Sequence, residues 1–358
     1  ADNDGTVEWL ESYKDEYNLK YIVNDTGELY GIGKAYDKCV EESETDIFMI
    51  FHADMMLGRD ADYHAMKYLD KKKVVCATRI EPPLHPEGPE KIVKDFGMWP
   101  EKDIEDGWRD KDFDVFTDIM KEKNKDKITH GCFAPWMMLK DEFLEMGGHD
   151  PRFASAREDS DVFNRLVLSG FELIQSWESY VYHLTARAGQ FQHGKLTQDH
   201  SQKSQEWQKL MENSTREFFR KWGSAVNHDA HMMPIISPKY NIGFVVKNCN
   251  ENYLRMLEPW CSNIYVDCEI KTYINNEQPN TTDNLSEKVL SIHSEKNNDI
   301  IIRFDGSKMS NESFQFIQQL PLILKDSGEI GSMQYDIFEI EINSLKEYNE
   351  ELIKCHMI

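Results

Sequence analysis

The segment DIFMIFHADMML, residues 46–57, most constrains how this chain can fold. Five apolar residues follow one another from Ile47 to Phe51, and His52 and Asp54 come directly after them without a turn signal. Continuous apolar character, in place of alternation, is typical of a strand that is covered on both faces, as in the sheets of α/β proteins. We therefore predict a buried strand whose carboxyl end presents polar groups.

Up to about residue 185, other short apolar runs alternate with amphipathic segments. This alternation predicts an α/β fold with a mostly parallel sheet and flanking helices. The further strand candidates are LKYIV (19–23), KVVCA (73–77) and YVYHL (180–184). Helical spacing marks GKAYDKCVEES (33–43), DYHAMKYLDKK (62–72) and SQEWQKLMENSTREFFRKWG (204–223).

A second strand-rich pattern begins after the proline-containing segment HMMPIISPKY, residues 231–240. The segments NIGFVV, NIYVDCEI and DIIIRFD are its strand candidates, and amphipathic helical stretches separate them. Because a chain of 358 residues exceeds the size of one comfortable core, we predict a domain boundary near residue 235. The expected parts are a domain over 1–235 and a smaller α/β module over 236–358.

Charge and cysteine content limit the class of protein. The chain has 41 basic and 64 acidic residues, a formal net charge of −23, which disfavours nucleic acid as a partner. No run of about 18 apolar residues or signal-peptide pattern is present, so we expect no integral membrane segment. Seven cysteines without a C-x-x-C pair indicate reduced, structural thiols and a cytoplasmic location.

Asp54 and His52 are the first candidate site residues. Ligands bind at the carboxyl ends of strands in open α/β sheets, and by the two-residue period of a strand these side chains share one side. An imidazole and a carboxylate there suit a cation or its ligand. The alternatives are an ordinary turn or helix cap for Asp54 and a hydrogen-bonded core histidine for His52.

The segment REDSDVFNRLVLSGFEL, residues 157–173, is a second candidate. It predicts a helix start, where acidic residues interact favourably with the helix dipole, and Asp161 can also pair with Arg165 four residues later. Glu158, Asp159 and Asp161 nevertheless crowd more negative charge than capping requires, which favours a role near a cation or a substrate hydroxyl. His183, at the end of YVYHL, is a further candidate metal ligand.

Together, these segments resemble the nucleotide-sugar-dependent glycosyltransferases of the GT-A fold, family 2 type, from residue 1 to about 223. The resemblance rests on DGTVEWL (4–10), YGIGKAYDKCVEE (30–42), FHADMML (51–57), PWMMLKDEFLEMGGHDPRF (135–153), REDSDVFNRLVLSGFEL (157–173), YVYHL (180–184) and NSTREFFRKWG (213–223). It implies a Rossmann-like GT-A catalytic domain over 1–235. Its first strand and helix are missing, so either the chain lacks its true amino terminus or another segment supplies them, such as the first strand and helix of the C-terminal module.

The resemblance also implies roles for individual residues. Asp54 matches the last aspartate of the D-x-D motif, which holds Mn²⁺ or Mg²⁺ on the donor diphosphate, and His183 matches the late metal-side histidine. Asp159 matches the general base that accepts a proton from the acceptor hydroxyl, and Glu158 matches its acidic neighbour.

On the nucleotide side, the resemblance assigns Gly31, Lys34 and Asp37 to a helix whose residue types vary in the family. His52 stands where the first aspartate of D-x-D is usual, a departure that affects the strength and choice of metal. The later polar segment AGQFQHGKLTQDHSQKSQ, which contains His193 and Lys195, is expected to form either a lid that orders on donor binding or a flexible loop.

The implied function is inverting transfer of a sugar from a nucleotide-diphosphate sugar to a hydroxyl of a carbohydrate acceptor. One alternative is an inactive carbohydrate-binding or assembly protein on the same scaffold, and another is a sugar nucleotidyltransferase. The module over 236–358 faintly resembles a degenerate GT-A half, because DIIIRFD also ends in an aspartate, Asp305. We expect this module to bind acceptor or to mediate homo-oligomer formation.

Overall fold

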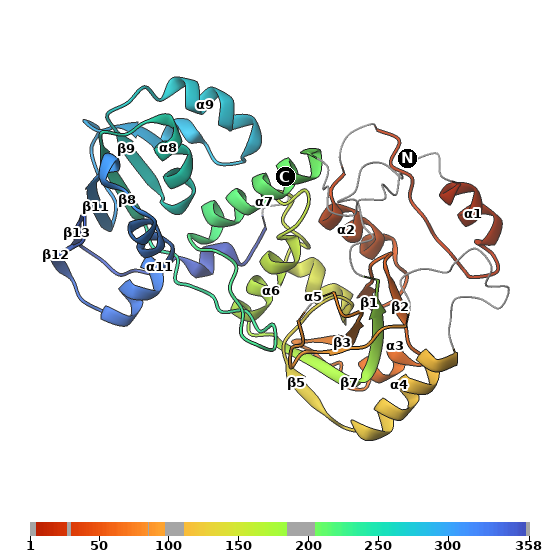
Figure 1. Cartoon of the computed structure of the whole chain (residues 1–358). Helices are drawn as coiled ribbons and strands as arrows, with labels where there is room; N and C mark the ends of the chain where they lie inside the picture. The colour runs from red at the N-terminus through yellow and green to blue at the C-terminus, as the bar shows by residue number, and fades with distance from the viewer. Residues whose placement is uncertain (1–4, 27–29, 85, 97–110, 185–204, 356–358) are drawn as a thin grey trace. The chain divides into compact units, whose positions relative to one another are not determined.

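The computed structural model describes residues 5–26, 30–84, 86–96, 111–184 and 205–355 (Figure 1). The chain forms two compact units. Unit 1 comprises Ala1–Leu210, His228–Pro234 and His356–Ile358, and unit 2 comprises Met211–Asn227 and Ile235–Cys355. The domain boundary near residue 235 stays a prediction, and residues 211–227 pack with unit 2 ahead of it.

Unit 1 is built on a seven-stranded sheet with the order β1-β6-β3-β7-β2, in which β4 also pairs with β3 and β5 with β7. Its strands are β1 (Ile47–Ile50), β2 (Met55–Leu57), β3 (Lys73–Glu81), β4 (Lys91–Val93), β5 (Ile128–His130), β6 (Trp136–Leu139) and β7 (Glu172–His183). The predicted α/β class is confirmed. The sheet is mixed rather than mostly parallel: β3 runs parallel to β7 and β4, whereas β1–β6, β3–β6, β2–β7 and β5–β7 are antiparallel. Strand direction depends on the connections between strands, which apolar runs alone do not reveal.

The helices of unit 1 are α1 (Thr6–Tyr13), α2 (Ile32–Glu42), α3 (Ala61–Met66), α4 (Lys111–Lys123), α5 (Lys140–Glu145) and α6 (Glu158–Leu168), followed by α7 (Gln205–Trp222), which continues into unit 2. The helices predicted at 33–43, at 204–223 and after the acidic segment at 157–161 are present, the one predicted at 62–72 is shorter, and α1, α4 and α5 are not predicted from spacing. None of the helices that the structure describes has both the length and the apolar character needed to cross a membrane.

The strand predicted at residues 19–23 is wrong, because this segment forms no strand. Ile22 and Val23 are 48% and 42% exposed. Apolar and β-branched residues favour a strand only where a neighbouring strand and a surface to pack on are available. Within the described residues, this segment has neither.

The strand β1 has apolar neighbours on both faces, as the opening segment predicts. Phe48 and Ile50 are buried in a cluster that includes Trp136 and side chains of α5 and α6, and the Phe48 and Trp136 rings meet edge to face at 5.7 Å. Ile47 and Met49 pack on the opposite face against residues of α3, β3, β6 and β7. Burial on both sides fixes the position at which the chain leaves the sheet toward Asp54.

Unit 2 has its own six-stranded sheet with the order β10-β9-β8-β11-β13-β12. Its strands are β8 (Ile242–Lys247), β9 (Asn263–Val266), β10 (Val289–Ser291), β11 (Ile300–Asp305), β12 (Gly331–Tyr335) and β13 (Phe338–Ile342). Its helices are α8 (Glu251–Leu257), α9 (Lys271–Glu277), α10 (Leu285–Lys288) and α11 (Asn311–Ser327), with the 3₁₀ turns η1 (Glu258–Trp260), η2 (Gln278–Asn280), η3 (Gly306–Lys308) and η4 (Asn349–Leu352). The strands β10, β9, β8 and β11 are parallel, and β13 and β12 complete the sheet in antiparallel pairs. The expected additional α/β module is therefore confirmed.

A buried ion network ties the end of α7 to unit 2. Arg220, which lies on α7, donates to Glu258 and Glu277 at 2.6 Å each. Arg216 contacts Glu277 at 2.8 Å and Lys288 contacts Glu258 at 3.0 Å. Burial would raise the pKa of Glu258, but these cations outweigh burial and lower it. Removing one partner would leave a buried charge unpaired and lower the free energy of unfolding. We therefore interpret this network as structural.

Candidate active site

The polar residues after β1 are positioned by the pairing of β2 with β7. Met55 of β2 lies opposite His183, the last residue of β7, and the Asp54 carbonyl accepts a hydrogen bond from the Leu184 N–H at 2.7 Å. This register brings two side chains together, with Asp54 Oδ2 at 3.6 Å from His183 Nε2. The two residues that the sequence assigns to a metal therefore meet across an antiparallel pair.

Glu81, which sequence reasoning missed, holds the other ring nitrogen of His183. The parallel pairing of β3 with β7 places the end of β3 beside His183, and Glu81 Oε1 lies 3.1 Å from His183 Nδ1. Glu81 is 2% exposed, and its carboxylate also contacts Arg79 at 2.9 Å and Lys91 at 3.5 Å. The only signal in the sequence is a charged residue at the end of the apolar run KVVCATRIE.

The protonation of this group follows from its contacts. Burial would raise the pKa of Glu81, but the His183 hydrogen bond and the neighbouring cations outweigh it and lower the pKa to about 2. Burial would lower the pKa of His183, but its hydrogen bonds with Asp54 and Glu81 raise it. The His183 hydrogen bond is also the largest cause of the lowered pKa of Asp54. Both carboxylates are thus ionised on either side of the imidazole.

This geometry fits one divalent cation between Asp54 and His183. Ligand atoms 3.6 Å apart are close enough for a cation with bonds of about 2.1 Å to contact both. An outer carboxylate on the second ring nitrogen, as Glu81 provides, is the usual way in which a metal-binding imidazole is oriented. In the described part of the chain, no third carboxylate, imidazole or thiol lies within 4.8 Å of both ligand atoms, so further positions would fall to a ligand or to water.

His52 stacks on Tyr36, a residue of α2 that sequence reasoning also missed. The two rings are nearly parallel, with centroids 5.9 Å apart. Burial lowers the pKa of His52, although the negative charges of Asp54 and Asp159 act in the opposite direction. Burial, followed by the charges of Glu158, Asp54 and Asp159, raises the pKa of Tyr36. Side chains from α2, from the end of β1 and from the start of α6 are therefore within electrostatic reach of one another.

Glu158 and Asp159 begin α6, where the two preceding residues, Ala156 and Arg157, have positive φ angles of 64° and 71°. Non-glycine residues in this region cost about 1–3 kcal/mol each and cluster at functional sites. The Glu158 Oε2 atom is buried without a hydrogen-bond partner among the described residues. Burial and the charge of Asp159 raise the pKa of Glu158 to about 8, so at neutral pH it is mostly a protonated acid.

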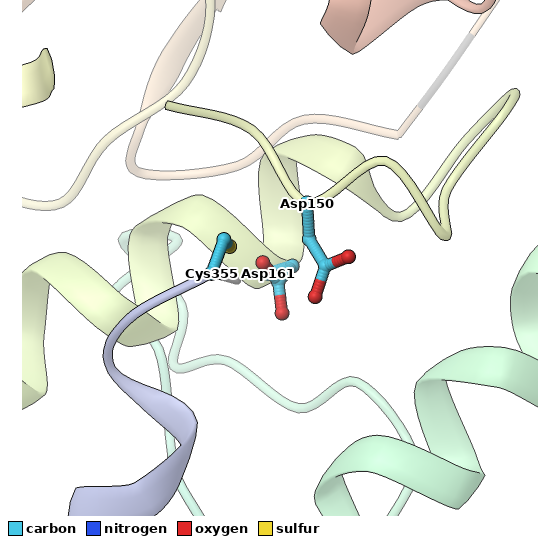
Figure 2. Close-up of side chains that lie close together, drawn as sticks. All are labelled: Asp150, Asp161 and Cys355. Carbon is cyan, nitrogen blue, oxygen red and sulfur yellow. The ribbon is translucent and has the colours of Figure 1, made fainter. Parts of the chain in front are cut away.

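The third acidic residue of this segment, Asp161, is structural. Its carboxylate lies 2.8 Å from Arg165 Nε, both side chains are fully buried, and Arg165 also donates to the Met146 carbonyl at 3.3 Å. Figure 2 shows Asp161 on α6 with Asp150 on the preceding loop, and their carboxylate oxygens lie within 4.8 Å of each other. The pairing expected from the spacing of Asp161 and Arg165 is confirmed, so only Glu158 and Asp159 remain as candidates from the acidic segment.

The nucleotide-side residues of α2 have different surroundings. Asp37 binds the loop ahead of α6, accepting from the His149 backbone N–H at 2.9 Å and lying 2.6 Å from His149 Nδ1. Lys34 is exposed, with its ammonium 4.7 Å from the Tyr30 ring centroid. Gly31, at φ 80°, precedes α2, and a Cβ there would lie 3.1 Å from the Ala154 carbonyl oxygen. No described hydrogen bond or ion pair links these three residues to Asp54.

The site thus brings together Asp54, His183, His52, Glu158 and Asp159, as the sequence predicts, and adds Glu81 and Tyr36. His193 and Lys195, the predicted lid residues, lie outside the described residues. The roles assigned to all of these residues stay predictions at this point, because what the structure establishes is their arrangement.

Comparison with known protein families gives a match in the first part of the chain. Residues 1–143 match the family model described as glycosyl transferase family 2. No curated protein matches the chain. Among solved structures, the chain is similar to the crystal structure of GalNAc-T7 with UDP, GalNAc and Mn²⁺, at 14% sequence identity and a TM-score of 0.36. That similarity covers 51% of this chain and 36% of the other, so the chain spans about a third of that structure.

Proposed function

Because residues 1–143 match the family model of glycosyl transferase family 2, we propose that the chain is a metal-dependent glycosyltransferase. It transfers a sugar from a nucleotide-diphosphate sugar to a hydroxyl of a carbohydrate acceptor. The observation that carries the proposal is the Asp54–His183–Glu81 arrangement, with Asp54 Oδ2 at 3.6 Å from His183 Nε2. Glu158, Asp159 and His183 lie beyond the matched residues, so their proposed roles rest on geometry.

Asp54 and His183 would hold a Mn²⁺ or Mg²⁺ ion. When bound, such an ion neutralises the negative charge that develops on the leaving diphosphate. Glu81 keeps the Nε2 atom of His183 directed toward Asp54 by binding Nδ1. Because a metal-binding imidazole must be neutral, His183 would hold the ion through a deprotonated Nε2 atom, while its Nδ1–H group would donate to Glu81.

Asp159 would act as the general base. A sugar hydroxyl is a weak nucleophile, so a carboxylate must accept its proton as the new bond forms. Glu158 is held mostly protonated by burial and by the charge of Asp159, which raise its pKa to about 8, so Glu158 itself is poorly suited to accept that proton at neutral pH. In-line attack of the hydroxyl inverts the anomeric configuration.

The unpartnered Oε2 of Glu158 also supports this proposal. A buried carboxyl oxygen without a hydrogen-bond partner costs about 1–3 kcal/mol, and a substrate hydroxyl or ring oxygen would satisfy it. Tyr36 and His52, stacked on each other, would provide an aromatic surface for the substrate. These side chains come from three separate elements, so the site depends on the folded unit.

The test is release of nucleoside diphosphate from a panel of nucleotide sugars in the presence of Mn²⁺ or Mg²⁺. We expect release that chelation abolishes and that Asp159→Asn reduces at least a hundredfold. The matched control is Asp62→Asn, an exposed acid of α3, which should retain full activity. Asp159→Asn should still bind the nucleotide sugar, since a base is not needed for binding.

Two other outcomes identify the alternatives. Binding of carbohydrate without turnover of any donor would indicate an inactive scaffold, and pyrophosphate release from a nucleoside triphosphate and a sugar phosphate would indicate a nucleotidyltransferase. Either result contradicts the proposal. The cytoplasmic location and homo-oligomer formation through residues 236–358 stay predictions, to be checked by fractionation and by light scattering.

A further inference from the structure

Unit 2 has the topology of an open α/β sheet that changes direction beside its first strand. From β8 the chain passes through α8 to β9 and then to β10 on one side, and it returns to the other side of β8 to form β11. These four strands are parallel, so their carboxyl ends share one edge. Ligands of open α/β sheets bind outside that edge.

A cavity of about 430 Å³ lies at this edge, beside the ends of β9 and β10. Residues 266–271 and 291–293 line it, and all of them belong to unit 2. Its volume is within the range of small-molecule pockets. The cavity is formed by unit 2 alone, whereas the Asp54 site is formed by unit 1, and the proposed glycosyltransferase activity gives the cavity no role.

Two carboxylates on one side of this cavity are fixed by backbone donors. Asp267 accepts from the Asn248 and Cys249 N–H groups at 2.7 and 3.0 Å, and Glu269 accepts from the Lys271 N–H at 2.6 Å. A carboxylate has about four acceptor positions, so each keeps the capacity to accept from a ligand. Their orientation is set before any ligand arrives, which reduces the ordering cost of binding.

Two basic side chains also line the cavity. Lys271 and His293 are exposed, and neither side chain makes a hydrogen bond or ion pair within the described ranges. In a chain with a net charge of −23, the Lys271 ammonium supplies local positive charge that can attract an anionic group, and the His293 imidazole can donate a hydrogen bond to it. The partly buried Ile270 and Ile292 add apolar surface to the lining of the cavity.

We propose that this cavity binds a nucleotide. Its phosphate would contact Lys271 and His293, and one face of its base would pack on Ile270 and Ile292. N–H or O–H groups of the base and ribose would donate to the two fixed carboxylates. A nucleotide carries these three chemical features in one small molecule, whereas a free sugar lacks the anion and a simple anion lacks the apolar ring.

The experiment uses the full chain and four nucleoside 5′-monophosphates, UMP, CMP, AMP and GMP. Calorimetry measures affinity, and hydrogen exchange measured by mass spectrometry locates the bound nucleotide. We expect at least one nucleotide to bind and to protect residues 266–271 and 291–293. Lys271→Glu should weaken that binding about tenfold or more through loss of a charge-assisted contact, whereas Lys325→Glu, an exposed charge reversal in α11, should leave it unchanged.

A second pair of variants blocks the cavity without changing charge. Ser291→Trp should abolish binding, and Ser332→Trp on β12 should not; thermal unfolding checks that both remain folded. Absence of binding by all four nucleotides, protection confined to unit 1, or inorganic phosphate binding as tightly as every nucleotide would each overturn the proposal. Asp54→Ala should leave this binding intact, so failure here is distinct from failure of the proposed glycosyltransferase activity.

Discussion

The segment around the end of β1 in unit 1 and the segment around the end of β11 in unit 2 both begin with Asp-Ile and place an aspartate after a largely apolar run. The first reads DIFMIFHADMM over residues 46–56, and the second reads DIIIRFDGSKM over residues 299–309. In unit 1, Asp54 faces His183 at 3.6 Å. In unit 2, Asp305 accepts from the Ser307 N–H at 2.9 Å and from the Asn248 amide at 3.0 Å.

This difference shows that a carboxylate at a strand end does not by itself make a site. Asp305 is satisfied by backbone and amide donors and caps the turn η3, as an ordinary cap does. Asp54 instead faces the imidazole of His183, whose other ring nitrogen, Nδ1, contacts Glu81. The neighbouring strands, rather than the aspartate, decide which of the two strand ends has the chemistry of a metal site.

The largest expected difference in activity is between the variant that lacks the Asp54 carboxylate and the variant that lacks the Asp305 carboxylate. Asp54→Ala should reduce release of nucleoside diphosphate about a thousandfold, because loss of the cation forfeits several kcal/mol of transition-state stabilisation. Asp305→Ala should change it less than about twofold while lowering the free energy of unfolding slightly, because the cap of η3 is lost. Kinetics and thermal unfolding of both variants check this, and equal activity of the two would remove the distinction between the strand ends.

Backbone packing gives the next largest expected effect. A Cβ at Gly131, in unit 1, would lie 1.8 Å from the His231 carbonyl oxygen, whereas a Cβ at Gly243, in unit 2, would meet the end of the Asn298 side chain at 2.3 Å. Backbone cannot move aside as a side chain does, so Gly131→Ala should cost about 3 kcal/mol or more, and Gly243→Ala less. Urea denaturation measures both; a smaller loss for Gly131→Ala would contradict the packing described for unit 1.

The next comparison is between one buried carboxylate of each unit, Glu81 in unit 1 and Glu277 in unit 2. Glu81→Gln should raise the Mn²⁺ concentration needed for half-maximal activity about 10–100-fold, as loss of an outer metal-site partner does. Glu277→Gln removes a carboxylate of comparable burial from the ion network of unit 2, and it should lower stability without changing metal dependence. Titration of the activity of both variants with Mn²⁺ distinguishes these outcomes. The same change in metal dependence in both variants would mean that Glu81 acts only through stability.

The smallest expected effect is the pH dependence of stability, which has opposite signs for two acids. The pKa of Glu158 is raised to about 8, so its contribution to stability is lost as pH rises from about 4.5 through 8. The pKa of Glu258 is lowered, so its contribution is present above about 4.5 and is lost as pH falls further.

Glu158→Gln should therefore flatten the loss of stability between about pH 5 and 8.5, while Glu145→Gln, an exposed acid of α5, should leave the slope unchanged. Urea denaturation at several pH values measures this slope. A slope that persists in Glu158→Gln would show that another group carries it.

Part of the site could be predicted from the sequence, because local patterns carry it. The apolar run before His52 and Asp54 identifies a buried strand with polar residues at its end, and the excess of acids before an amphipathic helix identifies Glu158 and Asp159. Glu81 and Tyr36 could not be predicted in this way. Their roles come from the pairing of β3 with β7 and from the stacking of α2 against His52, and neither contact leaves a pattern in the local sequence.

The sequence by itself determined the α/β class and the placement of several helices and strands, and it predicted candidate residues for metal and proton chemistry, since hydrophobic periodicity and residue type are local properties. Only the tertiary structure decided that the sheet of unit 1 is mixed, that residues 19–23 form no strand, and that Asp54 meets His183 while Asp305 caps a turn. Each of these depends on which distant segment lies beside a strand. Pairing between distant segments is set by the free energy of the whole fold.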